Sequence, residues 1–237
     1  MSLLEVEKLS VEFPTPNGPV RALREISFAM DREKIGIVGE SGSGKTLTAL
    51  SLLGLVRPPG KVRARKMLFD GIDLTAADAG KWRQIRGGRI SMVMQDPKYS
   101  LNPVMTVGKQ IAEVFRIHKS ARKAEARDRA MEMLEAVRIR DPKRVFHAYP
   151  HQVSGGMGQR VMIAMMLAPD PDLLIADEPT SALDATVRLR LLSILDDLVA
   201  RRGMGLLFIS HDLNLVSSFC DRVVIMYAGR VVETCDA

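Results

Sequence analysis

The chain has 237 residues, of which 46% are hydrophobic and 26% are charged, a length sufficient for one large domain or two small ones. This balance excludes collagen-like, coiled-coil and disordered chains. Lys and Arg number 34 against 28 Asp and Glu, so the net charge is +6. A positive charge favours a polyanionic partner without deciding between nucleotide phosphates, nucleic acid and an anionic membrane face.

The sequence carries neither a disulfide pattern nor a targeting signal. With only Cys220 and Cys235, no disulfide framework is expected, and a reducing compartment fits better. Residues 1–7 lack the basic and apolar regions of a signal peptide. The longest uncharged apolar run, at 161–168, is far shorter than a membrane-spanning helix. We therefore expect that the chain does not cross a membrane by itself.

The first part of the chain alternates short apolar runs with turn residues. Apolar residues alternate with polar ones from Leu4 to Phe13, which predicts an edge strand or hairpin arm, and residues 14–19 form a turn cluster. The expected elements up to residue 95 are strands at 4–13, 26–30, 35–38, 67–69 and 90–94 and a helix at 46–56.

The remainder of the chain begins with a charged, helix-like segment at 96–160, which includes a helix at 121–137. Strand and helix signals then alternate. The expected elements are strands at 173–176, 206–209 and 223–226 and a helix at 185–202. These patterns predict an α/β fold in a single domain: an α/β core from residues 1–95 and 161–237, with antiparallel strands near the N-terminus and an inserted helical segment at 96–160.

Residues 39–46 fit the pattern G-x4-G-K-[ST], between a predicted strand and a predicted helix. The glycines let backbone N–H groups surround a phosphate, and a helix N-terminus adds positive charge. We expect Lys45 to reach the β- and γ-phosphates and Thr46 to bind Mg²⁺; a glycine-rich turn without function is the alternative. The expected nucleotide-binding residues are Gly39, Glu40, Ser41, Gly42, Ser43, Gly44, Lys45 and Thr46.

Two adjacent acids, Asp177 and Glu178, end an apolar strand. Ligands of α/β sheets gather at the carboxyl ends of strands, so these acids and the phosphate loop are expected to converge. Asp177 would hold Mg²⁺ through water, and Glu178 would accept a proton from an attacking water. The alternative is an acidic turn that caps the next helix.

A second small-residue helix start lies at 154–160, where Ser154, Gly155 and Gly156 leave N–H groups open to an anion. One nucleotide does not obviously need two such sites. A dimer would account for both, with Ser154 and the two glycines closing on a nucleotide held by the other subunit.

The order of the phosphate loop, Gln95, residues 153–157, residues 173–178, residues 181–184 and His211 resembles the nucleotide-binding domain of an ABC transporter over essentially the whole chain. The resemblance implies the P-loop NTPase fold of an ABC ATPase, with ATP and Mg²⁺ as ligands. It implies that Gln95 contacts Mg²⁺, that Asp184 lies in a loop crossing the dimer interface, and that His211 contacts the γ-phosphate. Phe13, where the family commonly has Tyr, would stack on adenine. The implied metal ligands are Thr46, Gln95 and Asp177.

Val153 and Met157 stand where many members of the ABC family have Leu and Gln. Residues 95–103 and 154–165, Met157 included, are similar to the peptide and nickel importer subgroup. Members of this subgroup usually continue well past the position of Ala237. The resemblance implies an ATPase that energises uptake of dipeptides or oligopeptides, or else of nickel or another small solute. The implied partners are a second ABC ATPase, identical or different, two transmembrane permease subunits and, indirectly, an extracytoplasmic solute-binding protein. The implied location is peripheral, on the cytoplasmic face of the plasma membrane.

Two rival hypotheses remain open from the residues. A soluble ABC-type ATPase acting on nucleic acid would fit the positive charge, although no nucleic-acid partner is expected, since the chain lacks a long coiled-coil insert and a duplicated domain. A P-loop kinase would leave residues 154–157 without a role. The basic run at 57–66 is expected to be a solvated face, and His118, His147 and His151 are expected at the surface or in loops.

Overall fold

The computed structural model describes residues 2–96, 100–181 and 183–237. The chain forms two compact units, one made of Met1–Arg86 with Gly205–Ala237 and the other of Gly87–Met204. The helical segment expected at 96–160 lies wholly inside the second unit. Each unit is described by itself below.

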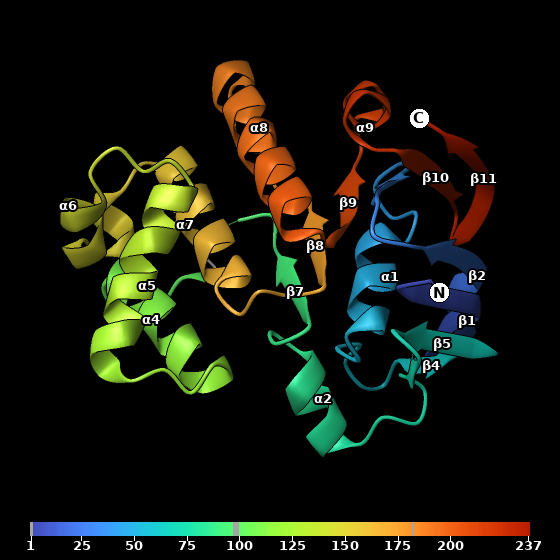
Figure 1. The fold of residues 1–237 in the computed structure, drawn as a ribbon. Coiled ribbons are helices and arrows are strands. Elements are labelled where there is room, and N and C mark those ends of the chain that lie inside the picture. Colours follow the sequence, from blue (N-terminus) through green and yellow to red (C-terminus); the bar gives the residue numbers. More distant parts are fainter. Residues whose placement is uncertain (1, 97–99, 182) are drawn as a thin grey trace. The chain divides into compact units, whose positions relative to one another are not determined.

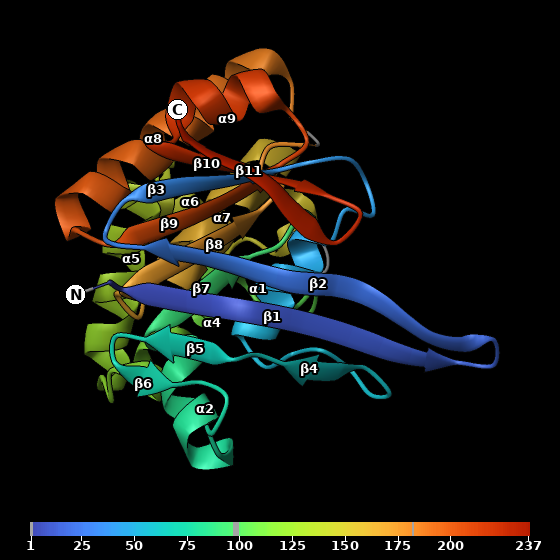
Figure 2. The ribbon, with the colours of Figure 1, turned by 90° about the vertical axis from the view of Figure 1, so that its right-hand side faces the viewer.

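The first unit contains an antiparallel sheet built on a long hairpin of β1 (Leu4–Thr15) and β2 (Gly18–Met30). The short strands β4 (Lys61–Arg63), β5 (Lys66–Phe69) and β6 (Ile72–Asp73) complete it; β4 and β5 both pair with β1, and β6 pairs with β5. Figure 2 shows β1 and β2 side by side along their length, with β4 and β5 beside β1. The predicted hairpin is confirmed, and β2 begins earlier than the expected residue 26.

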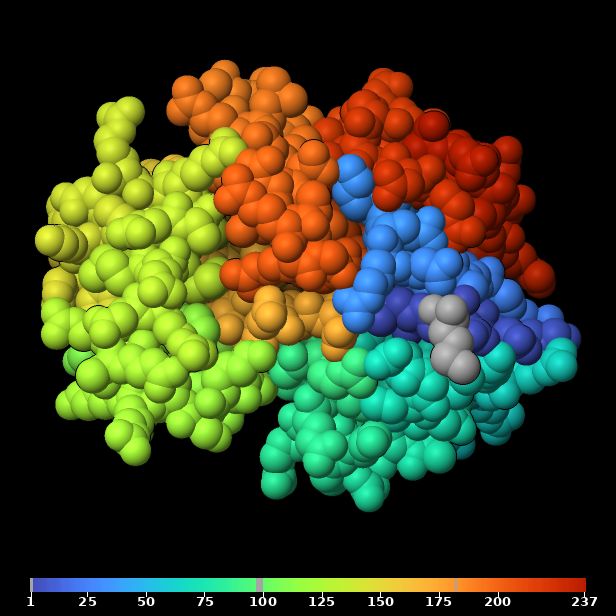
Figure 3. Space-filling model, in the orientation of Figure 1, coloured from blue at the N-terminus to red at the C-terminus, as the bar shows by residue number. Residues whose placement is uncertain are grey.

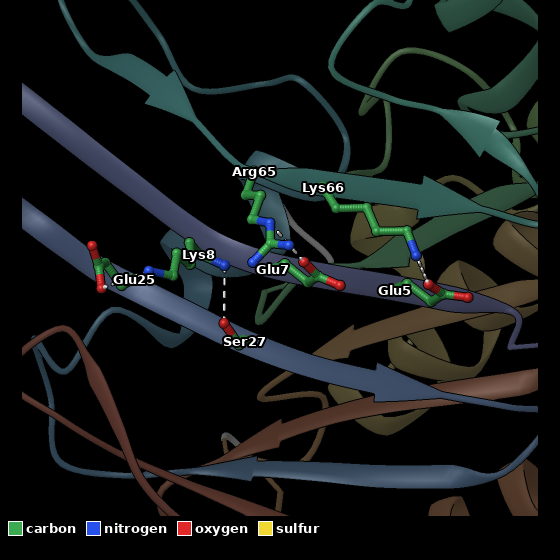
Figure 4. Close-up of polar contacts among 7 residues, drawn as sticks. All are labelled: Glu5, Glu7, Lys8, Glu25, Ser27, Arg65 and Lys66. Carbon is green, nitrogen blue, oxygen red and sulfur yellow. Dashed lines mark hydrogen bonds and ion pairs between the residues drawn. The ribbon is translucent and has the colours of Figure 1, made fainter.

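Ion pairs line the exposed side of this sheet and involve the end of the basic run at 57–66 (Figure 4). Arg65 Nε lies 3.4 Å from Glu7 Oε2, and Lys66 Nζ is hydrogen-bonded to Glu5 Oε2. The hydrogen bond to Glu5 raises the pKa of Lys66 above its usual value. The β1 carboxylates therefore neutralise part of the basic run, as expected of a solvated face.

The second sheet of the first unit runs in the order β11-β10-β3-β9. The strands β3 (Lys34–Val38), β9 (Gly205–Ser210) and β10 (Arg222–Tyr227) are parallel, and β11 (Arg230–Asp236) is antiparallel to β10. Every residue of β9 is buried, as expected for a strand covered on both faces. The predicted strands at 35–38, 206–209 and 223–226 are confirmed.

The helices of the first unit are α1 (Lys45–Leu52), α2 (Ala79–Ile85) and α9 (Leu213–Phe219). The predicted helix at 46–56 ends earlier than expected, because Gly54 adopts a left-handed φ of 59° and closes a turn after Leu52. The helices α2 and α9 are seven residues each, too short for a clear helical period in the sequence.

The second unit combines two parallel strands with a group of helices. The strands are β7 (Ile90–Val93) and β8 (Leu173–Asp177). The helices are α4 (Val107–His118), α5 (Lys123–Ala136), α6 (Pro142–His147), α7 (Gly155–Leu167) and α8 (Ala185–Arg202), with a short 3₁₀ turn at Pro150–Gln152. The predicted helices at 121–137 and 185–202 are confirmed.

Helices α4, α5, α6 and α7 gather together within this unit (Figure 1). The side chains of α4 and α5, in yellow-green, form a continuous surface in the space-filling view (Figure 3). Apolar residues such as Ile111, Ala130 and Leu134 are fully buried between these helices. Among the described residues, no helix is long and apolar enough to cross a membrane. The expected α/β class, with an antiparallel sheet and a helical segment, is confirmed.

Candidate functional site

The glycine loop at 39–46 wraps around the N-terminus of α1. Gly42 and Gly44 both have left-handed φ angles, 82° and 103°, which only glycine adopts without strain. Gly44 is the N-cap of α1, and no side chain of the described chain caps this helix end. The N–H groups of the first turn are therefore open to an anion, as the sequence pattern predicts.

Lys45 directs its ammonium group into this loop. Its Nζ donates to the carbonyl oxygens of Gly39 at 2.7 Å and Glu40 at 2.9 Å, although the residue is only 6% exposed. The loop thus holds a buried cation beside open N–H groups. Both features suit a polyphosphate, and an uncharged turn would need neither. Thr46 is exposed in the first turn of α1.

His211 follows the neighbouring parallel strand. Val38, at the end of β3, is the register partner of Ser210, at the end of β9. The loop that begins at Gly39 and the exposed side chain of His211 therefore leave the same edge of the sheet. The structure brings these two predicted parts together within the first unit.

Phe13 lies near the far end of β1 and pairs with Val20 of β2. Its ring is half-buried and rests against Gly60, where an added Cβ would lie 2.6 Å from Phe13 Cε1. Val20 is 54% exposed, so this end of the hairpin offers an apolar surface to an aromatic ring.

The second unit brings together Gln95, Asp177 and Glu178. Val93 of β7 and Ala176 of β8 are register partners in a parallel pair. Gln95 lies two residues beyond Val93 and Glu178 two residues beyond Ala176, so all three predicted side chains follow the same strand edge. Asp177 is 6% exposed, Glu178 is half-buried and Gln95 is exposed.

Glu178 has an unusual backbone. Its φ is 47°, in the left-handed region that non-glycine residues rarely adopt. The turn is held by two hydrogen bonds to the Glu178 carbonyl oxygen, from the Ser181 N–H at 3.3 Å and the Ser181 hydroxyl at 3.1 Å. Eight of the described non-glycine residues have a positive φ, so this conformation fixes the direction of the Glu178 side chain without by itself assigning it a role.

Ser154 and Asp184 each cap a helix of the second unit. Ser154 Oγ accepts from the Met157 N–H at 3.4 Å at the start of α7, and Asp184 Oδ1 accepts from the Val187 N–H at 3.0 Å at the start of α8. A Cβ added to Gly156 would lie 2.8 Å from Val187 Cγ1, so the first turns of the two helices touch at this glycine. Ser154 and Gly155 are exposed.

Arg160 is a supporting residue that the sequence analysis did not single out. Its guanidinium donates to the carbonyl oxygens of Gly156 at 3.2 Å and Arg138 at 2.8 Å and so fixes the start of α7. Burial, and secondly the nearby charge of Arg190, lower its pKa. The sequence feature that could have indicated this role is the position of Arg160, about two turns into the helix that Ser154 begins.

The residues present fit ATP with Mg²⁺. The loop at 39–46 offers a cation and open N–H groups, while the described residues hold no cluster of three His, Cys, Asp or Glu side chains. Mg²⁺ commonly takes one or two protein ligands and completes its shell with phosphate oxygens and water. The hydroxyl of Thr46 in the first unit and the carboxylate of Asp177 in the second unit are each donors of a kind that Mg²⁺ accepts.

Comparisons with known proteins show the family of the chain. The family model described as "ABC transporter" matches residues 23–181. The chain is 47% identical to the dipeptide transport ATP-binding protein DppD of Escherichia coli (strain K12), over 100% of this chain and 73% of that protein. It is 49% identical to a putative peptide import ATP-binding protein of Brucella abortus (strain 2308), over 98% of this chain and 70% of that protein.

Solved structures of similar fold are also ATP-binding cassettes. A dimeric structure of the bacterial ABC transporter cassette MJ0796 superposes with a TM-score of 0.86 at 26% identity and covers 98% of each chain. The same cassette in a post-hydrolysis state with ADP and Pi gives the same values. The structure of cbiO1 from Clostridium perfringens has a TM-score of 0.84 at 26% identity and covers 99% of this chain and 88% of its own.

This chain belongs to the ABC transporter family, in which it is an ATP-binding cassette. It is an ATPase, and ATP is its nucleotide. The family resemblance stated from the motif order is thereby confirmed.

Proposed function

We propose that this chain is the ATP-hydrolysing subunit of an importer for dipeptides or oligopeptides, bound to the cytoplasmic face of the plasma membrane. The observation that carries the proposal is the 47% identity over 100% of the chain to a dipeptide transport ATP-binding protein. A peptide import protein of a second organism, 49% identical over 98% of the chain, supports the same cargo.

In the first unit, the glycine loop takes the phosphates of ATP. The N–H groups of residues 39–46 bind the β- and γ-phosphate oxygens, and the Lys45 ammonium moves from the carbonyls of Gly39 and Glu40 to the phosphates. His211, at the same sheet edge, contacts the γ-phosphate. Phe13 stacks on the adenine ring through its π face.

In the second unit, the residues at the ends of β7 and β8 bind the metal and accept the proton. Mg²⁺ bound with ATP would neutralise phosphate charge, and Thr46, Asp177 and Gln95 would hold it, in part through water. The Glu178 carboxylate accepts the proton of the water that attacks the γ-phosphate. Its left-handed backbone, φ 47°, supports a carboxylate with a fixed direction.

The working assembly in this proposal contains two ATPase subunits and two permease subunits. Ser154, Gly155 and Gly156 of one copy close on the nucleotide of the partner copy, and Asp184 lies in the loop that crosses between them. The exposure of Ser154 and Gly155 at a helix N-terminus and the dimeric MJ0796 cassette support this arrangement. The closing of the two ATPase subunits moves the permeases, and a solute-binding protein delivers cargo to the permeases from outside.

Uptake in cells tests the cargo. Cells that carry the transporter with this chain should accumulate a labelled dipeptide, and the same cells with Lys45→Ala should not, because the variant lacks the phosphate-binding cation. Labelled Ni²⁺ is measured in parallel. Accumulation of Ni²⁺ without dipeptide would contradict the peptide assignment. Dipeptide uptake that survives Lys45→Ala would contradict the ATPase role.

A further inference from the structure

The turn between β10 and β11 touches the back of the glycine loop. The Gly229 N–H donates to the Ser43 carbonyl oxygen at 3.0 Å, and the Gly229 carbonyl oxygen accepts from the Arg24 N–H at 2.7 Å. One residue of this turn is therefore hydrogen-bonded to the loop at 39–46 on one side and to β2 on the other. All of these residues belong to the first unit.

The bond to Ser43 fixes the direction of a loop N–H. A trans peptide is planar, with its C=O and N–H pointing in opposite directions. The carbonyl of Ser43 and the N–H of Gly44 belong to one such plane. Because the Ser43 carbonyl points to Gly229, the Gly44 N–H points away from the β10–β11 turn and is left available to an anion.

The contacts around this turn leave no room for adjustment. A Cβ added to Gly229 would lie 2.4 Å from the Ala22 carbonyl oxygen, and one added to Gly39 would lie 2.1 Å from the Met226 carbonyl oxygen. Both obstacles are backbone atoms, which cannot turn aside as a flexible side chain can. The loop, the turn and β2 are therefore packed backbone against backbone.

We propose that Gly229 is a positioning residue for ATP binding: through its two hydrogen bonds, the β10–β11 turn holds the glycine loop in the shape that receives phosphate. This rests on the proposed role of residues 39–46 in binding the phosphates of ATP. In this proposal Gly229 contacts the loop through Ser43 and not the nucleotide. Its effect reaches the ligand through the Ser43–Gly44 peptide.

The first unit contains a matched control for Gly229. The β5–β6 turn has Asp70 at φ 47° and Gly71 at φ 75°, and the β10–β11 turn has Ala228 at φ 45° and Gly229 at φ 78°. Positive φ at both central residues marks a type I′ hairpin turn in each case. A Cβ added to Gly71, however, meets nothing within 4 Å. Alanine at Gly71 imposes the same backbone strain without the collision.

The experiment compares Gly229→Ala, Gly71→Ala and Lys45→Ala with the unmodified chain. Nucleotide affinity is measured with a fluorescent ATP analogue, well below the thermal unfolding temperature of each variant, together with kcat and KM for ATP. Gly229→Ala should weaken affinity and raise KM by roughly tenfold or more, because displacements of about 1 Å at a binding geometry have effects of that order. Gly71→Ala should leave affinity within about twofold, since it only changes stability.

The outcomes separate the two proposals. If Gly229→Ala binds nucleotide as Gly71→Ala does, while Lys45→Ala loses binding, the positioning role is overturned and the phosphate role of the loop stands. If Lys45→Ala still binds normally, the proposed site itself is wrong. A purely structural role for Gly229 would lower the unfolding temperature of both glycine variants alike without changing KM.

If Gly229→Ala does not fold, hydrogen exchange of the unmodified protein tests the proposal instead. The Gly71 N–H has no backbone acceptor outside its own hairpin among the described residues, whereas the Gly229 N–H is bonded to Ser43. The Gly229 amide should exchange at least about tenfold more slowly than that of Gly71 and slow further when Mg·ADP is added. Equal exchange rates, or no response to Mg·ADP, would overturn the proposal.

Discussion

Cys220 and Cys235 differ in environment, and their reactivity should differ accordingly. Cys220 is 7% exposed, and burial raises the pKa of its thiol to about 12. Cys235 is exposed on β11. Because the thiolate is the reactive form, iodoacetamide at pH 8 should modify Cys235 in the folded protein and Cys220 only after unfolding, as peptide mass spectrometry would show. Equal labelling of both in the folded protein would contradict the burial of Cys220.

His118 should make stability depend on pH. Burial, and secondly the charge of Lys119, lower the pKa of His118 below its usual 6.5. The folded state thus favours the neutral ring, so the free energy of unfolding is full above the unfolded-state pKa and is lost as the pH falls from there through the lower folded-state pKa. The free energy of unfolding should decline from pH 7 to pH 5 more steeply for the unmodified protein than for His118→Gln. Parallel pH profiles would contradict this.

At the scale of single residues, the sequence predicted the glycine loop better than it predicted the backbone conformation of single residues such as Glu178. The glycine loop was predicted because its residue pattern and its flanking elements constrain each other. The left-handed φ of Glu178 could not be predicted, because glutamate has no local preference for that region. The positioning role of Gly229 could not be predicted from the sequence, because its contacts are with Ser43 and Arg24, which lie far away in the chain.

At the scale of elements, the junction of α7 and α8 offers a matched pair of substitutions. A Cβ at Gly156 would lie 2.8 Å from Val187 Cγ1, whereas a Cβ at Gly155 would meet nothing within 4 Å. Valine is stiff at χ1, so it cannot move aside easily. Gly156→Ala should lower the free energy of unfolding by ~1–3 kcal/mol, and Gly155→Ala should leave it unchanged or raise it by ~0.5–1 kcal/mol.

Urea unfolding at fixed temperature measures this difference. A Gly156→Ala variant as stable as Gly155→Ala would show that the first turns of α7 and α8 do not touch.

The predicted elements that matched the structure were the longer ones, such as α8, or apolar runs, such as residues 173–176 of β8. The elements β4, β6 and α2 were missed, because three, two and seven residues are too few to establish a period.

At the scale of the whole molecule, the account requires two copies. Ser154→Arg should place a long cation at the exposed start of α7. Nucleotide binding at the Lys45 loop of the same copy should persist, whereas ATP turnover should fall by at least about a hundredfold, because the partner's ATP loses its second set of donors. Mixing with Lys45→Ala protein checks the assignment. In a mixed dimer both defects fall in the same composite site, so the other composite site is intact and should restore part of the turnover. Full turnover by Ser154→Arg alone would contradict the shared site.

The pairing of two copies could not be derived from the residues of one chain by physical reasoning alone. The exposed helix start at Ser154 indicated a second anion site. The family resemblance supplied the partner. What one chain does establish is that the two predicted groups, Lys45 with His211 and Gln95 with Glu178, each follow one sheet edge in their own unit.

The most direct test of the central claim is the mass of a hydrolysis-blocked protein in the presence of Mg·ATP. Glu178→Gln keeps the size and hydrogen-bonding capacity of the side chain but cannot accept the proton of the attacking water. Sedimentation at increasing Mg·ATP should show this variant, alone or with its sister ATPase, passing from monomer to dimer, while turnover is nearly abolished. A variant that binds Mg·ATP yet stays monomeric, or that hydrolyses ATP at the normal rate, would contradict the account.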